Sequence, residues 1–151
     1  MEEKIKVMVV DDSLPFRSIL SSILSQHPNI EVVATAYSGK MALHRLKTEQ
    51  KLPDVIILDY EMPELDGFQT LKILKEEYPL ISVIMLSSYA EENSHFSQKA
   101  KNLYADEVMY KPSSGKSREE NIEKIKNELI NKIFRCYENS KLFKKEKNKE
   151  E

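Results

Sequence analysis

The sequence predicts an α/β fold in which a parallel sheet of five strands is covered by helices on both faces. Short apolar runs alternate with longer amphipathic segments five times along the 151 residues, and this alternation is typical of β/α units. The first, third and fourth apolar runs are almost continuous, as expected of strands that are buried on both faces. A chain of this length buries roughly 68–70% of its unfolded surface, which is enough for one domain with a core.

Two β/α units precede the middle strand. Ile5–Val10 is a short run rich in β-branched residues, and Pro15–Ser25 follows it with apolar residues at helical spacing. Ser13 can cap that helix, and proline is tolerated within the first turn. Glu31–Ala36 is the second predicted strand, and a serine-glycine turn then opens a second helix over Lys40–Thr48.

Three further units complete the predicted sheet. Strands are expected at Asp54–Leu58, Ser82–Leu86 and Glu107–Tyr110, and helices at Phe68–Glu77, Glu91–Leu103 and Arg118–Tyr137. The helix before the fifth strand is only weakly amphipathic. The last helix has the clearest pattern, because its apolar residues lie on one broad face.

Residues 138–151 lose this periodicity and carry five lysines and four glutamates. We therefore predict a domain over residues 1–137 and a charged, disordered tail over residues 138–151. The net charge of −2 does not favour nucleic acid as a partner, and no apolar run is long enough to cross a membrane. The single cysteine, Cys136, has no partner for an internal disulfide, which fits a cytoplasmic location.

Acidic residues close two of the predicted strands, in the stretches VMVVDDS at 7–13 and VIILDYEMPELDG at 55–67. Ligands of open parallel sheets bind outside the carboxyl ends of the strands, so Asp11, Asp12 and Asp59 should meet at one edge. Three close carboxylates repel each other, and a divalent cation relieves that repulsion. Mg²⁺ is the expected ion because it prefers oxygen ligands and takes only a few carboxylates. An aspartate placed there can also accept a phosphoryl group as a nucleophile.

Two more strand ends supply groups that suit a phosphoryl ligand. Ser87 follows the fourth strand, and its hydroxyl can donate to a phosphoryl oxygen. Lys111 follows the fifth strand, where its ammonium group can act as a point charge. Four strand ends with complementary groups are a more specific pattern than any one of them.

The motifs VVDDS (9–13), ILDYEMPELDG (57–67), MLSS (85–88) and YKPSSG (110–115) resemble the receiver domain of two-component response regulators over about residues 5–137. Within that family the chain looks most similar to the receiver half of the chemotaxis protein-glutamate methylesterase. The resemblance implies the flavodoxin-like strand order 2-1-3-4-5. It also implies that Asp59 is the phosphoacceptor, and that Asp11, Asp12, Asp59 and the backbone carbonyl of Glu61 hold Mg²⁺.

The same resemblance implies roles for the remaining groups and for partners. Ser87 would be the switch hydroxyl, Lys111 would contact the phosphoryl group, and the Lys111–Pro112 peptide bond would be cis. A histidine kinase would supply the phosphoryl group. A downstream protein would then read the face formed by the fourth helix, the fifth strand and the fifth helix.

Two positions depart from the family pattern. Many receivers carry an aromatic residue three positions before the lysine, where this chain has Val108, and we expect Tyr110 to lie on another face. Tyr104 stands where a glycine is usual before the fifth strand. We therefore expect the acid site to be retained and the coupling of hydroxyl to aromatic ring to be absent or rerouted.

Three functional hypotheses follow. The first is a single-domain response regulator in chemotaxis or another phosphorelay; no methylesterase activity is expected, because the chain has no Gly-x-Ser-x-Gly motif and no room for a second domain after the receiver. The second is a phosphate sink or pseudo-receiver without conformational output, which the missing aromatic slightly favours. The third is an FMN-binding protein, which the acidic stretch DDSLP disfavours because it would repel a phosphate without a metal.

Overall fold

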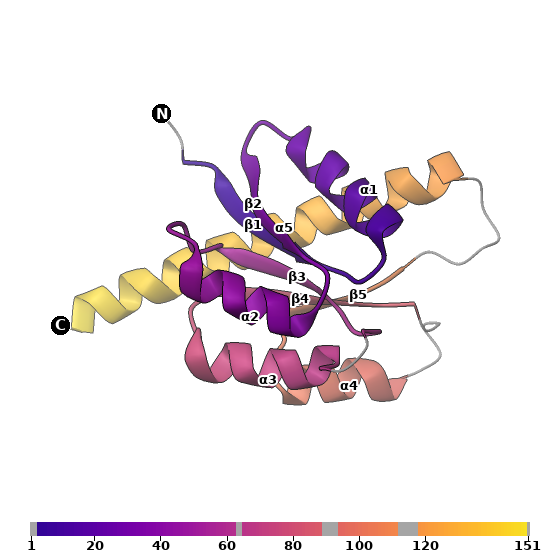
Figure 1. The fold of residues 1–151 in the computed structure, drawn as a ribbon. Coiled ribbons are helices and arrows are strands. Elements are labelled where there is room, and N and C mark those ends of the chain that lie inside the picture. Colours follow the sequence, from indigo (N-terminus) through magenta and orange to yellow (C-terminus); the bar gives the residue numbers. More distant parts are fainter. Residues whose placement is uncertain (1–2, 63–64, 89–93, 112–117, 151) are drawn as a thin grey trace.

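A five-stranded parallel sheet with the order β2-β1-β3-β4-β5 forms the centre of the protein (Figure 1). The computed structural model describes residues 3–62, 65–88, 94–111 and 118–150. The strands are β1 (Ile5–Val10), β2 (Ile30–Ala36), β3 (Val55–Asp59), β4 (Ser82–Ser87) and β5 (Glu107–Tyr110). The flavodoxin-like order is confirmed, and each strand begins and ends within one residue of its predicted bounds.

Helices cover both faces of this sheet, as predicted. They are α1 (Leu14–Ser25), α2 (Gly39–Thr48), α3 (Gly67–Glu77), α4 (Ser94–Asn102) and α5 (Arg118–Glu150). α1 and α5 lie on one face and α2, α3 and α4 on the other (Figure 1). Among the described residues, no helix combines the length and the apolar character needed to cross a membrane.

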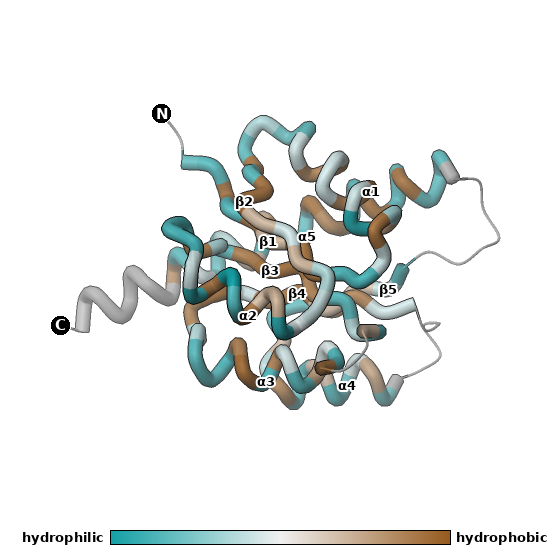
Figure 2. Tube along the Cα trace, viewed as in Figure 1, coloured by the Kyte–Doolittle hydropathy of each residue, from teal (hydrophilic) through white to brown (hydrophobic). Residues whose placement is uncertain are grey.

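Two apolar clusters, one on each face of the sheet, form the core. Alternate residues of β1 enter different clusters: Val7 and Val9 pack with α1 and α5, whereas Met8 and Val10 pack with α2, α3 and α4. This is the two-residue period of a strand that is buried on both faces. Figure 2 shows the apolar residues concentrated along the strands and on one side of the helices. The almost continuous apolar runs of the sequence are therefore the consequence of a sheet between two helical layers.

The last helix is longer than the sequence pattern predicted. α5 continues to Glu150, so a disordered tail over residues 138–151 is the wrong prediction for residues 138–150. Lysine, glutamate and leucine are good helix formers, and this segment contains no glycine or proline to end the helix. The amphipathic pattern is lost because the helix runs beyond the sheet (Figure 1), where Leu142 is 61% exposed. A domain boundary at residue 137 stays a prediction.

Val108 and Tyr110 both pack against the cluster under α2, α3 and α4, and Met109 packs against the opposite cluster. The expectation that Tyr110 lies on another face is therefore wrong, because side chains two residues apart on a strand share a face. The ring of Tyr110 lies 5.9 Å from that of Phe96 in α4, measured between centroids. An aromatic side chain therefore lies beneath α4 even though position 108 is valine.

Tyr104, two residues after the end of α4, lies in the left-handed region of backbone space, with a φ of 69°. The amide of Ala105 donates to the carbonyl of Ala100, and the amide of Tyr104 donates to that of Lys101, each at 2.9 Å. This pair of bonds is the Schellman motif, whose left-handed position usually carries glycine. A Cβ atom is strained in that conformation. Since the Tyr104 residue is 76% exposed, packing does little to offset the strain.

The substitution Tyr104→Gly is expected to raise the free energy of unfolding by about 1 kcal/mol, the relieved strain less the added entropy of the unfolded chain. Urea unfolding of both proteins would measure this difference. Tyr104→Ala is the matched control, because it removes the ring but keeps the Cβ atom, and it should show no gain. Lower stability of the glycine variant would show that contacts of the ring outweigh the strain.

Candidate metal centre

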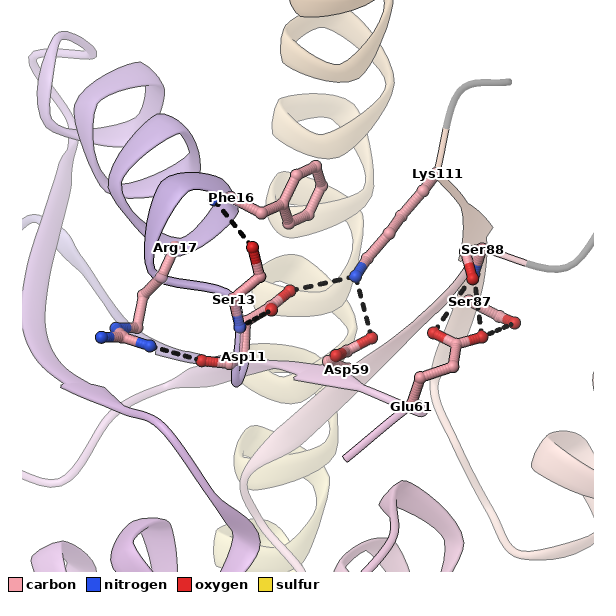
Figure 3. Close-up of polar contacts among 9 residues, drawn as sticks. All are labelled: Asp11, Ser13, Phe16, Arg17, Asp59, Glu61, Ser87, Ser88 and Lys111. Carbon is pink, nitrogen blue, oxygen red and sulfur yellow. Dashed lines mark hydrogen bonds and ion pairs between the residues drawn. The ribbon is translucent and has the colours of Figure 1, made fainter. Parts of the chain in front are cut away.

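Three aspartates meet at the carboxyl end of the sheet, where β1 and β3 lie side by side (Figure 3). Asp11 and Asp12 follow β1, and Asp59 is the last residue of β3. One carboxylate oxygen from each of the three lies within 4.8 Å of the others. The structure thus brings together the three acids that the strand ends predicted would converge.

Pairing between strands sets the positions of these groups along the edge. β1 pairs with β3 so that Val10 is opposite Leu58, which leaves the next residue of each strand, Asp11 and Asp59, as neighbours. β4 and β5 continue the sheet, and the amide of Lys111 donates to the carbonyl of Ser87 at 2.8 Å. Acid, acid, hydroxyl and lysine are therefore arranged in the order of the strands β1, β3, β4 and β5.

Burial disfavours the charged forms of Asp11 and Asp59. Their residues are 0% and 1% exposed, whereas Asp12 is open to solvent. Burial, aided by the charge of Asp11 and opposed by that of Lys111, raises the pKa of Asp59 to about 8. Burial also raises the pKa of Asp11, again against the opposing charge of Lys111. Both acids therefore favour a proton or a further cation over a bare negative charge.

Lys111 supplies part of that compensation. Its Nζ lies 3.0 Å from Asp59 Oδ1 and 3.2 Å from Asp11 Oδ2. Burial alone would lower the pKa of Lys111, but the charges of Asp59 and Asp11 raise it above its ordinary value. The same Nζ lies 4.5 Å from the ring centroid of Phe16 in α1, a cation–π contact that was not predicted from the sequence. The ammonium group is thus held between the aromatic ring and the two acids.

The acid cluster has the donor set that Mg²⁺ requires. Within the described residues, no well-aligned hydrogen bond reaches either oxygen of Asp59 or Oδ2 of Asp11, although all three atoms are buried. The ammonium of Lys111 pairs with two of these oxygens, but it is one positive charge shared by two buried acids. Uncompensated buried carboxylates are costly, and a hard cation supplies the missing charge. Solvent exposure at Asp12 leaves room for the waters that Mg²⁺ usually keeps. The residues present therefore fit a magnesium ion.

The turn that leads into α1 holds Asp11 in place. Its Oδ1 accepts from the amide of Ser13 at 2.8 Å, and its backbone carbonyl accepts from Nη1 of Arg17 at 2.6 Å. Ser13 in turn caps α1, since its Oγ accepts from the amide of Phe16 at 3.4 Å. The predicted cap residue thus also fixes the first acid of the cluster.

The start of α3 supports the other acid. Asp66 and Gln69 form a capping box, with both hydrogen bonds at 2.9 Å. The amide of Gly67 donates to the carbonyl of Tyr60 at 3.2 Å. A Cβ atom added at Gly67 would lie 2.7 Å from Cα of Tyr60 and 2.8 Å from the carbonyl oxygen of Asp59. The absence of a side chain therefore lets α3 approach the backbone that carries Asp59.

The side chain of Glu61 makes contacts that were not predicted. Its Oε1 accepts from the hydroxyl of Ser87 at 2.8 Å and from the amide of Ser88 at 3.0 Å (Figure 3). Burial would raise the pKa of Glu61, but these hydrogen bonds lower it below its ordinary value. The sequence shows only an acid two positions after Asp59. The roles predicted for the Glu61 carbonyl and for Ser87 stay predictions, and the predicted cis peptide bond involves Pro112, which lies outside the described residues.

Comparison with known sequences identifies relatives over most of the chain. The family model described as the response regulator receiver domain matches residues 7–124. The protein-glutamate methylesterase/protein-glutamine glutaminase of Trichodesmium erythraeum is 42% identical over 130 residues, which are 86% of this chain and 36% of that protein. Its counterpart in Halalkalibacterium halodurans is 43% identical over 133 residues, 88% of this chain and 37% of the relative. The chain thus spans little more than a third of the length of these relatives.

Solved structures show the same fold. The response regulator domain of Thermotoga maritima CheB superposes with a TM-score of 0.79 and 33% identity, over 90% of this chain and 98% of that one. A chain of the CheX–CheY–BeF3–Mg complex of Borrelia burgdorferi gives a TM-score of 0.74 with 21% identity, over 89% and 90% of the two chains. The second likeness shows the fold alone.

Proposed function

Because the chain belongs to the response regulator receiver domain family, we propose that Asp59 accepts a phosphoryl group and that a partner protein reads the modified state. The observation that carries this proposal is the surroundings of Asp59. Its carboxylate is buried beside two further acids, and a lysine ammonium lies 3.0 Å from its Oδ1. A nucleophilic oxygen, a cation site and a fixed positive charge are the parts that phosphoryl transfer to an acid requires.

Each residue has a distinct part in the proposed transfer. Asp11, Asp12, Asp59 and the backbone carbonyl of Glu61 would hold Mg²⁺, which when bound neutralises charge on the incoming phosphoryl group. An oxygen of ionised Asp59 attacks phosphorus while the bond from phosphorus to the donor breaks, and an aspartyl phosphate forms. Lys111 then pairs with a phosphoryl oxygen.

The hydroxyl of Ser87 donates to a second phosphoryl oxygen in this proposal. A phosphoryl group adds negative charge at the edge of the sheet, and movement of Ser87 and Lys111 toward it biases the face formed by α4, β5 and α5. A histidine kinase is the proposed donor, and a downstream protein binds that face. Similarity to chemotaxis methylesterases and to a CheB domain supports a chemotaxis pathway in the cytoplasm.

We propose that this chain signals and does not itself hydrolyse esters, because its 151 residues contain no Gly-x-Ser-x-Gly motif. The alternative is a phosphate sink or pseudo-receiver, and valine at position 108 is the observation that favours it. Backbone NMR spectra with and without a phosphoryl mimic separate the two. Shifts that reach α4 and β5 would support conformational output, and shifts confined to the acid cluster would support the sink.

Intact mass spectrometry tests the proposal directly. Incubation with a small acyl phosphate should add one phosphoryl group to the wild type in the presence of Mg²⁺ and none in its absence. Asp59→Asn should gain none, because the amide is a poor nucleophile. Asp66→Asn is the matched control: it makes the same chemical change nearby, asparagine also caps helices, and it should be phosphorylated like the wild type. Phosphorylation of Asp59→Asn would contradict the assignment, as would a wild type that accepts nothing from an acyl phosphate or a phosphorylated histidine kinase.

A further inference from the structure

The Glu61 carboxylate occupies the space between the ends of β3 and β4 (Figure 3). Its Oε1 accepts a hydrogen bond from the hydroxyl of Ser87 at 2.8 Å. Its two oxygens lie 3.0 and 3.3 Å from the amide nitrogen of Ser88. A carboxylate that accepts an O–H and an N–H makes charge-assisted hydrogen bonds, which are stronger than neutral ones. In the unphosphorylated protein, an internal acid therefore binds the hydroxyl that is proposed to bind the phosphoryl group.

The two acceptors compete for a single proton. A serine hydroxyl carries one hydrogen, so Ser87 can donate to Glu61 or to a phosphoryl oxygen on Asp59, but not to both. Ser87 is 0% exposed, which keeps bulk water from replacing either acceptor. Glu61 is two residues from Asp59 in the chain, and like charges brought together in a half-buried site repel. A phosphoryl group on Asp59 thus attracts the hydroxyl of Ser87 and, by charge repulsion, weakens the hydrogen bond between that hydroxyl and Glu61.

We propose that Glu61 is a positioning residue that holds Ser87 and Ser88 in the resting arrangement and opposes the phosphorylated one. This inference rests on the proposed function and adds its regulation. The phosphorylated state forms only when Ser87 exchanges the Glu61 carboxylate for the phosphoryl group. Glu61 therefore sets part of the free energy that phosphorylation must supply before the face formed by α4 and β5 changes.

A purely structural role for Glu61 makes a different prediction. If its carboxylate only ties the end of β3 to the end of β4, removing it should change the affinity for a phosphoryl mimic to the same extent whether or not Ser87 carries a hydroxyl. If it competes for the hydroxyl, the effect must depend on Ser87. A double-mutant cycle over Glu61 and Ser87 therefore separates the two roles.

The cycle uses beryllofluoride at saturating Mg²⁺ as the mimic and compares wild type, Glu61→Ala, Ser87→Ala and the double variant by calorimetric titration. Glu61→Ala is expected to lower the Kd about tenfold when Ser87 is present, because a hydrogen bond to a charged group no longer has to be broken. In the Ser87→Ala background the same change should lower the Kd about threefold or less, since only the charge repulsion is relieved. Equal changes in both backgrounds would overturn the inference.

A second readout observes the hydrogen bond without any phosphoryl ligand. In the ligand-free protein, the Ser88 amide proton should move upfield in Glu61→Ala and less in Glu61→Gln, whose carbonyl still accepts. Asp66→Asn, which removes the charge of a carboxylate that accepts from the Gln69 amide in α3, should leave that proton in place. An unchanged Ser88 amide in Glu61→Ala would also overturn the inference.

The two readouts keep the inference separate from the proposed function. A wild type that fails to bind Mg²⁺ and beryllofluoride would contradict the proposed function, and the regulatory role of Glu61 would be lost with it. Binding of the mimic with equal effects in both backgrounds would contradict only the role of Glu61.

Discussion

Asp59→Asn should make the metal-free protein more stable than the wild type, by on the order of 5 kcal/mol at pH 8. The pKa of Asp59 is raised from 3.8 to about 8, chiefly by burial. The folded protein therefore binds a proton that the unfolded chain releases near pH 4. The stability from this neutral carboxyl is fully present below about pH 4 and is lost as the pH rises to about 8. Asparagine keeps the shape of the side chain and has no such loss.

Urea unfolding in the presence of a chelator, at several values between pH 5 and pH 8.5, measures this effect as the difference between the two proteins. The difference should grow with pH, since titrating groups that do not interact with Asp59 affect both proteins alike. Added Mg²⁺ should stabilise the wild type increasingly as the pH rises and should stabilise Asp59→Asn much less. Parallel curves for the two proteins would show that Asp59 is ionised in the folded, metal-free state.

Gly67→Ala should destabilise the protein by about 3 kcal/mol, toward the upper end of the range for overpacked sites. The new Cβ atom would lie 2.7 Å from Cα of Tyr60, 2.8 Å from the carbonyl oxygen of Asp59 and 2.9 Å from Cε of Met85. Two of these three atoms are backbone, so a rotamer change cannot relieve the contacts. Either α3 moves outward or the chain at Asp59 shifts, and the affinity for Mg²⁺ should fall several-fold. Chemical denaturation and calorimetric Mg²⁺ titration would measure the two effects.

Gly39→Ala is the matched comparison for this prediction. A Cβ atom at Gly39 would collide with the Oγ1 of Thr70, a side-chain atom, and would lie 3.1 Å from Cδ2 of Leu65. Its loss of stability should therefore shrink in a Thr70→Ala background, whereas the loss at Gly67 should not. The Mg²⁺ affinity of Gly39→Ala should stay near that of the wild type. A Gly67→Ala protein with normal stability would show that α3 can retreat without cost.

The strands and the convergence of the acids could be predicted because each depends on a local pattern with one geometric outcome. Short, continuous apolar runs are typical of strands that are buried on both faces, and parallel strands bring their carboxyl ends to one edge of the sheet. The same two-residue period places Tyr110 on the face of Val108, as the structure shows. By contrast, the disorder predicted after residue 137 rested on the loss of an apolar stripe. A helix of good helix formers needs no such stripe to continue.

The side chains of Glu61 and Phe16 could not be placed from the sequence. Glu61 accepts a hydrogen bond from Ser87, which lies 26 residues further along the chain. The ring of Phe16 in α1 contacts the ammonium of Lys111, which follows β5. Both contacts depend on how loop and helix side chains are oriented by the assembled sheet. No periodicity along the chain encodes such an orientation.

The place of each strand in the sheet predicts different local stability for the acids and for the lysine of the site. β3 is paired on both sides, with β1 and β4, whereas β5, among the residues that the structure describes, is paired only with β4. Backbone amides of a central strand exchange with solvent mainly through global unfolding, and those of an edge strand through smaller openings. We therefore expect the strands that end at Asp11 and Asp59 to exchange among the slowest in the protein. Lys111 follows an edge strand, for which we expect local openings that leave the acids in place.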